Sequence, residues 1–244
     1  MLKYVPEELK TAKMCLTAVK QNAYNLQYVP ERFMTVKLCF MAVKTKGNAL
    51  RFIPQNLKTA ELCLVAVETI GNELQFVPEE HKTAELCFTA LMQDGLALAY
   101  VPEKIQSALL NLLAVMNNYE ALEYVPEKFK TTELCLAAVL LDGDALEYVP
   151  EELKTAELCL KAVRSSGWVL QYVPERLKTA KLCLAAVKDE GEALEFVPEN
   201  LRTAELCLTA VKKNGGALQY VPEKFKEQVR EVAKIPQLKT YSKK

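Results

Sequence analysis

Hydrophobic residues recur along this chain with a fixed spacing of 24 residues. The most regular marker is a Val-Pro or Ile-Pro pair, which returns over nine full periods without any insertion or deletion. Its first residue stands at Val5, Val29, Ile53, Val77, Val101, Val125, Val149, Val173, Val197 and Val221. A constant period of this length is typical of proteins in which one small unit stacks on the next. The sequence therefore predicts about ten tandem copies of one unit.

Each unit contains an apolar segment with the boundaries of an α-helix. A Thr such as Thr155 precedes the segment, where its hydroxyl can accept a backbone N–H as the N-cap. A Gly such as Gly167 follows it and suits the left-handed backbone just past a helix end. Together they predict a helix of about ten residues. Its apolar arc, 158–163 in this copy, is wider than one amphipathic face, so we expect both neighbouring copies to cover it.

The rest of each unit predicts a shorter helix and a bent connection. The run EALEF after Gly191 is compatible with a helix, but the Pro that follows disfavours α geometry at the Val before it. Pro can then start a 3₁₀ or α turn, which leads back to the Thr cap. The expected fold is an all-α solenoid that is continuous over residues 1–226, with a C-terminal cap and basic tail at 227–244.

The first residues already belong to a repeat, with no cap before them. A polar cap normally closes the end of a solenoid. We therefore expect either that the chain is part of a longer array or that its first edge pairs with another copy of the chain. Because the repeat begins at once, we expect no signal peptide. No apolar run reaches the length of a membrane span, so we expect a cytoplasmic protein with no membrane partner.

The charged residues are balanced, with 31 Lys plus Arg against 31 Asp plus Glu, so no overall field attracts nucleic acid. A local stripe remains, because a Lys or Arg stands three residues after the Glu of most Val-Pro-Glu segments. The stripe comprises Lys10, Lys58, Lys82, Lys130, Lys154, Lys178, Arg202 and Lys226. It makes nucleic-acid binding the alternative function, although the neighbouring Glu side chains cancel much of its field.

No set of residues predicts catalysis, a metal site or a cofactor. The eight Cys residues share one repeat position, in the middle of the long helix, so we expect small buried core thiols. Stacked copies would hold them too far apart for a disulfide or a tetrahedral zinc site. The single His81 stands where nearly every other copy has Leu or Phe, and it has no partners for nucleophilic catalysis. We therefore expect a protein that is not an enzyme.

Function should lie where the copies differ. The fifth copy departs most, with Ser107 for Thr, Leu109 for a charged residue, Asn111 for Cys and Tyr119 for Gly. The candidate partner-binding residues are Met92, Leu96, Leu109, Leu113, Met116, Tyr119, Leu140, Leu141 and Trp168. Exposed apolar side chains of this kind often mark a protein contact, and Met suits an adaptable surface. Local repacking around the fifth copy is an equally good explanation.

The repeat reads ALxYVPExLKTxELCLxAVxxxG, and over residues 2–226 it resembles an uncharacterised bacterial tandem-repeat family, a domain of unknown function. The combination of VPE, KT and LCLxAV carries the likeness, which implies no activity and no catalytic residues. In length the repeat is also similar to the leucine-rich repeat variant, whose α and 3₁₀ helices alternate in a superhelix. We predict a protein-binding or scaffolding protein with an unidentified protein partner, and with self-association as a second option.

Overall fold

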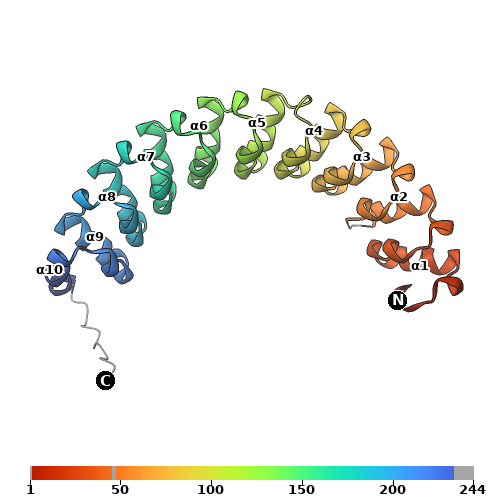
Figure 1. Cartoon of the computed structure of the whole chain (residues 1–244), viewed down its shortest axis with the longest axis horizontal. Coiled ribbons are helices and arrows are strands. Elements are labelled where there is room, and N and C mark those ends of the chain that lie inside the picture. Colours follow the sequence, from red (N-terminus) through yellow and green to blue (C-terminus); the bar gives the residue numbers. More distant parts are fainter. Residues whose placement is uncertain (1, 46–47, 234–244) are drawn as a thin grey trace, which may run out of the picture. The chain divides into compact units, whose positions relative to one another are not determined.

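The chain is a succession of helices. The computed structural model describes residues 2–45 and 48–233, and within these ranges every regular element is an α-helix or a 3₁₀ helix (Figure 1). One α-helix and two shorter 3₁₀ helices recur in most repeats, which confirms the predicted all-α repeat fold. The chain divides into two compact units, unit 1 (Met1–Phe129) and unit 2 (Lys130–Lys244). Continuity of the solenoid over 1–226 stays a prediction.

The α-helices have the expected length of about ten residues. Those of unit 1 are α1 (Ala12–Gln21), α2 (Val36–Lys44), α3 (Ala60–Thr69), α4 (Ala84–Gln93) and α5 (Ala108–Asn117). Those of unit 2 are α6 (Thr132–Leu141), α7 (Ala156–Ser165), α8 (Ala180–Asp189), α9 (Ala204–Lys213) and α10 (Glu223–Ala233).

Two kinds of 3₁₀ helix connect the α-helices. The six-residue kind is found at Ala23–Tyr28, Gly71–Phe76, Gly95–Tyr100, Tyr119–Tyr124, Gly143–Tyr148, Gly167–Tyr172, Gly191–Phe196 and Gly215–Tyr220. The three-residue kind is found at Leu2–Tyr4, Glu7–Leu9, Glu31–Phe33, Leu50–Phe52, Gln55–Leu57, Glu79–His81, Glu127–Phe129, Glu151–Leu153, Glu175–Leu177 and Glu199–Leu201. Most of the three-residue helices directly follow a Pro, as predicted.

The recurring Thr is the N-cap of the α-helix, as predicted. Thr155 accepts a hydrogen bond from the backbone N–H of Leu158 at 3.2 Å, and Thr179 accepts one from Leu182 at 3.3 Å. Ser107 makes the same bond to Leu110 at 3.3 Å in the fifth repeat. Each bond satisfies one of the N–H groups that the first helical turn leaves without a partner.

The recurring Gly has a role other than the predicted one. The prediction of a left-handed helix cap is wrong, because the backbone lies outside the left-handed region at Gly71, Gly95, Gly143, Gly167 and Gly191. Instead, a Cβ atom at Gly167 would lie 2.5 Å from the carbonyl oxygen of Ala186 in the next α-helix. At these five glycines successive repeats therefore meet backbone to backbone, and a Cβ would have no room there. The first and fifth repeats have Ala23 and Tyr119 at the same position. Gly47 lies outside the described residues.

The core covers most, but not all, of the apolar arc of the long helix. In α7, Leu158, Cys159, Ala162 and Val163 are buried, whereas Leu160 is only half-buried. The expectation that neighbouring repeats cover the whole arc is therefore only partly correct. One flank of each α-helix stays at the surface, and its residues decide what that surface can bind.

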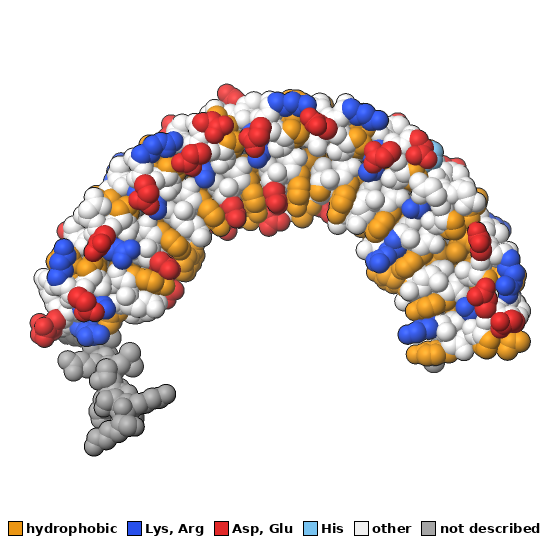
Figure 2. Space-filling model, in the orientation of Figure 1, with side chains coloured by type: hydrophobic (Ala, Val, Ile, Leu, Met, Phe, Trp, Pro, Cys, Tyr) orange, Lys and Arg blue, Asp and Glu red, His pale blue; other side chains and the backbone are white. Residues whose placement is uncertain are grey.

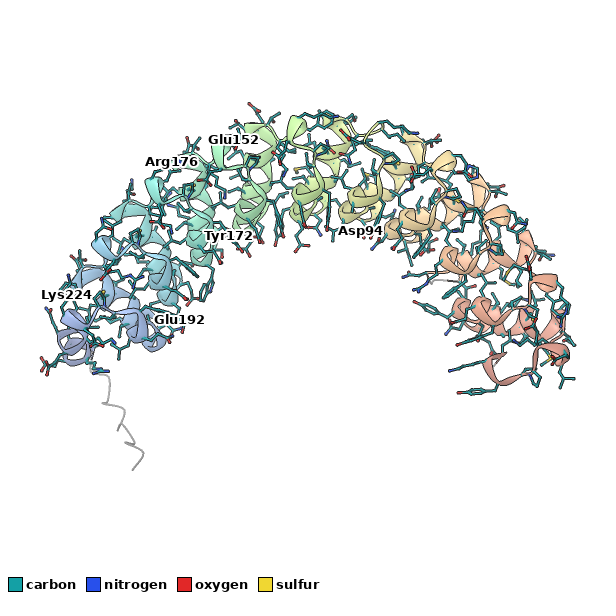
Figure 3. The ribbon with its side chains drawn as sticks, viewed as in Figure 1. Asp94, Glu152, Tyr172, Arg176, Glu192 and Lys224 are labelled. Atoms are coloured by element: carbon teal, nitrogen blue, oxygen red, sulfur yellow. The ribbon has the colours of Figure 1, made fainter. Side chains whose placement is uncertain are left out.

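In unit 2 the two kinds of 3₁₀ helix lie at opposite edges of the row of α-helices. Figure 3 shows Tyr172 and Glu192, from six-residue 3₁₀ helices, at one edge, and Glu152 and Arg176, from three-residue ones, at the other. In the view of Figure 2, acidic and basic side chains alternate along the edge with the three-residue helices. At the end of the unit, α10 packs on α9 and buries Val229. Residues 234–244 of the predicted tail lie outside the described residues.

Candidate functional site

An apolar stripe runs along the surface of α5. The stripe comprises Leu109, Leu112, Leu113 and Met116. Their spacings of three, one and three residues place them on one side of the helix. Leu109 is 68% exposed and Met116 is 52% exposed, while Leu112 is also exposed and Leu113 is half-buried. Among the α-helices that the structure describes, α5 alone has no charged residue.

The neighbouring helix α4 extends this surface. It packs directly against α5 and exposes Phe88 and Met92, one helical turn apart, at the repeat positions of Leu112 and Met116. We call the set Phe88, Met92, Leu109, Leu112 and Met116 the α4–α5 apolar face. Leu96 follows α4 in the 3₁₀ helix Gly95–Tyr100 and is half-buried. Tyr119, at the start of the next six-residue 3₁₀ helix, is half-buried as well.

The remaining candidate residues belong to unit 2. Leu140 and Leu141 form the end of α6, and both are exposed. Trp168 follows Gly167, is exposed, and makes an edge-to-face contact with Phe196 at 5.9 Å between ring centroids. The six exposed candidates of both units are not absorbed into the core, so local repacking does not account for them.

The buried side of α5 contains an amide without hydrogen bonds. Asn111, at the repeat position of Cys, is fully buried, and neither its Oδ1 nor its Nδ2 has a partner among the described residues. In the same repeat Gln106 stands at the Lys position, where its Nε2 donates to the carbonyl of Val101 at 3.2 Å and its Oε1 has no partner. A buried polar group without a partner costs about 1–3 kcal/mol. The fifth repeat therefore contributes less to the stability of the fold than its neighbours do.

Several side chains of the Lys stripe make bonds within their own repeat. The Nζ of Lys154 donates to the carbonyl of Tyr172 at 3.0 Å, and the Nζ of Lys178 donates to Glu175 at 2.7 Å. In unit 1, Lys10 and Lys58 reach the carbonyls of Tyr28 and Phe76, each at 2.8 Å. The Lys178 side chain is only 7% exposed. The ammonium groups of Lys10, Lys58 and Lys154 thus satisfy carbonyls at the ends of six-residue 3₁₀ helices, whereas that of Lys178 pairs with a carboxylate. Lys154 and Lys178 present little charge to solvent.

All eight Cys residues are buried, as predicted. Burial raises the pKa of the Cys39, Cys63, Cys87 and Cys183 thiols to about 11. At neutral pH these side chains are therefore thiols rather than thiolates, which are the nucleophilic and metal-binding form. Within residues 2–45 and 48–233, no three His, Cys, Asp or Glu side chains are grouped to hold a metal ion. No helix in the same ranges is long and apolar enough to cross a membrane.

The repeats match a known sequence family. The family model described as "Domain of unknown function (DUF4116)" matches residues 13–58, 110–154 and 156–202, which together are more than half of the chain. The chain belongs to this family. Each DUF4116 match spans about two of the 24-residue repeats. No curated protein and no solved structure matches the chain.

The DUF4116 matches leave most of the α4–α5 apolar face uncovered. Phe88, Met92 and Leu109 lie in the stretch between the first two matches. Sequence reasoning missed Phe88 and Leu112, because their repeat position belongs to the apolar arc that was expected to be covered. One signal was available, since no charged residue occurs anywhere in 108–117.

Proposed function

We propose that this protein binds another protein through the α4–α5 apolar face. The observation that carries the proposal is the exposed row of Leu109, Leu112 and Met116 on a helix without charge. Contiguous apolar surface is unfavourable in water and becomes favourable when a partner covers it. Because the row follows helical spacing, an amphipathic helix of the partner is the segment that fits it best.

The proposed role is binding or scaffolding without catalysis. Its support is the raised pKa of the buried thiols, which keeps them from acting as nucleophiles. We place the protein in the cytoplasm, where thiols stay reduced.

Nucleic-acid binding has weaker support than protein binding. Counterion release at phosphates requires Lys or Arg side chains that are free to meet them. Lys154 and Lys178 instead lie against carbonyl and carboxylate oxygens of the repeat framework and are largely buried.

Helical peptides provide a direct test of the proposed function. A displayed library of helical peptides would be selected against the wild type and then tested on a Leu109→Asp, Met116→Asp double variant. The matched control is Lys181→Asp, Lys188→Asp, which changes the same two repeat positions on α8. We expect binders with an apolar stripe, and at least about tenfold weaker binding to the double variant only.

Salt dependence separates the two functions. Binding of the selected peptides should change little between about 0.05 and 0.5 M salt, because apolar burial is not screened. Selected peptides that bind the double variant as tightly as the wild type would contradict the proposal. Tight binding of a single-stranded oligonucleotide that falls steeply with salt would instead favour the Lys stripe.

A further inference from the structure

Three rows of side chains run across the exposed flank of the α-helices in unit 1. The second, fifth and ninth residues of each α-helix lie on one side of it, because they are three and four residues apart. The helices α1–α5 pack side by side in chain order, so each of these positions forms a row along the unit (Figure 1). The middle row is apolar throughout and consists of Leu16, Phe40, Leu64, Phe88 and Leu112. The two outer rows carry the charge.

The outer rows are sorted by charge from one end of unit 1 to the other. They hold only Lys in α1 and α2, then Glu in α3 and at the start of α4, and apolar side chains from the end of α4 onward. In chain order one row is Lys13, Lys37, Glu61, Glu85 and Leu109, and the other is Lys20, Lys44, Glu68, Met92 and Met116. All of these side chains are exposed. The flank is therefore basic, then acidic, then apolar, and it ends in the α4–α5 apolar face.

Unit 2 mixes the two signs at the same repeat positions. There α7 has Glu157 together with Arg164, and α9 has Glu205 together with Lys212, so both signs occur on one α-helix. In unit 1 the opposite charges of this flank lie on different α-helices. Unit 1 therefore presents each sign to a partner as a block.

The carboxylates of the acidic block are available to a partner. No Lys or Arg occurs in α3, α4 or α5. Among the residues that the structure describes, none forms an ion pair with Glu61, Glu68 or Glu85. A partner segment that crosses this flank meets opposite charge only if it is basic over α3 and acidic over α1 and α2.

We propose that the partner segment is an amphipathic helix that lies across α1–α5, with an acidic end over α1 and α2, basic residues over α3 and the start of α4, and an apolar end over α5. It rests on the proposed protein binding at the α4–α5 apolar face and adds the order of charges in the partner. With neighbouring α-helices about 8–10 Å apart, α1 to α5 span about 32–40 Å, which a helix of about 21–27 residues covers. The apolar middle row contacts this helix along its length.

The charges set the direction of the partner helix more than its affinity. Exposed ion pairs add little to binding, whereas like charges placed opposite each other oppose it. A segment with the reverse order would bring carboxylates to Glu61 and Glu68 and ammonium groups to Lys37 and Lys44. The flank therefore rejects such a segment, while a correctly ordered one binds mainly through apolar burial.

Two synthetic helical peptides test the order of charges. Both have an apolar stripe along one side and an apolar end, and they differ only in that the acidic and basic blocks are exchanged. We expect the ordered peptide to bind the full chain with a Kd below about 100 μM, measured by fluorescence anisotropy. The exchanged peptide should bind at least about tenfold more weakly.

Reversal of the acidic block is the matching test on the protein. A Glu61→Lys, Glu68→Lys double variant should reduce the preference for the ordered peptide at least about threefold, because α3 then repels the basic block. The same positions hold Lys in α1, α2 and α8, so the variant should fold, which circular dichroism checks. The control Glu157→Lys, Glu205→Lys makes the same change in charge in unit 2 and should leave the preference unchanged.

Three results would overturn the proposed order of charges. They are no binding of the ordered peptide at about 100 μM, equal binding of the two peptides, and a preference that Glu61→Lys, Glu68→Lys leaves unchanged. The Leu109→Asp, Met116→Asp variant separates this failure from failure of the proposed function. If both peptides bind the wild type equally and neither binds this variant, the α4–α5 apolar face binds a helix and only the order of charges is wrong. If the ordered peptide binds this variant as tightly as the wild type, the proposed function is wrong, and the inference fails with it.

Discussion

Two repeats of the same length show how differently this framework can be used. In α8 the buried side carries Cys183 and the exposed side carries Lys181, so the core is apolar and the surface is charged. In α5 the same two positions hold Asn111 and Leu109, which reverses the arrangement, with an amide inside and a leucine outside. Both helices keep ten residues and the same N-cap bond. The fold therefore tolerates the reversal, and α5 gains a surface that α8 lacks.

The largest effect should come from the glycine that the regular repeat needs. In Gly191→Ala the new Cβ would meet the carbonyl oxygen of Ala210 and lie 2.9 Å from the amide nitrogen of Asn214. Backbone must move to admit it, so we expect a loss of about 2–4 kcal/mol in the free energy of unfolding, measured with urea.

Gly216→Ala is the matched control for this change. There the Cβ would meet the end of the Glu192 side chain, which can rotate away, and would lie 3.1 Å from the side-chain oxygen of Asn214. It would contact no backbone atom closely, so we expect a loss under about 1 kcal/mol. Equal losses in the two variants would show that backbone contact is not the reason for Gly. At the repeat position of Gly191, the fifth repeat has Tyr119 and the first has Ala23, so these two repeats differ from the others at this junction.

Exchanging the buried residues of α5 and α8 should give the next largest effect. Asn111→Cys removes an amide without partners, so we expect a gain of about 1–3 kcal/mol in the free energy of unfolding. Cys183→Asn should lose at least as much, because it buries such an amide. The new thiol at 111 should react with iodoacetamide as slowly as the native ones. A destabilised Asn111→Cys variant would mean that the amide has a role in the folded state.

The helix caps should show no difference between the two repeats. Thr179→Ala in α8 and Ser107→Ala in α5 each remove one side-chain bond to a backbone N–H, and each should cost about 1 kcal/mol. Urea unfolding of both variants checks this. A much smaller loss for Ser107→Ala would indicate that the start of α5 is frayed and that the contrast with α8 extends beyond side-chain placement.

Local sequence signals predicted most of the fold. The 24-residue period, the Thr caps and the Pro turns report on nearby residues, and the structure follows them closely. Predictions failed where the answer depends on a neighbouring repeat. The role of Gly191, for example, is set by Ala210 in the next α-helix.

The candidate site was predictable in part for the same reason. Leu109 and Met116 replace charged residues, so the sequence reveals them as unusual. Leu112 does not stand out, because the other repeats also have Leu or Phe at its position. Its exposure follows from which flank of the α-helix the next repeat leaves uncovered. Periodicity alone does not reveal that flank.

The most direct test of the central claim is the stability of a Leu109→Glu, Met116→Glu double variant. If the α4–α5 apolar face is a surface held for a partner, the free energy of unfolding in urea should stay within about 0.5 kcal/mol of the wild type, because neither side chain is in the core. A loss of about 3 kcal/mol or more would show that both residues belong to the core and would contradict the claim.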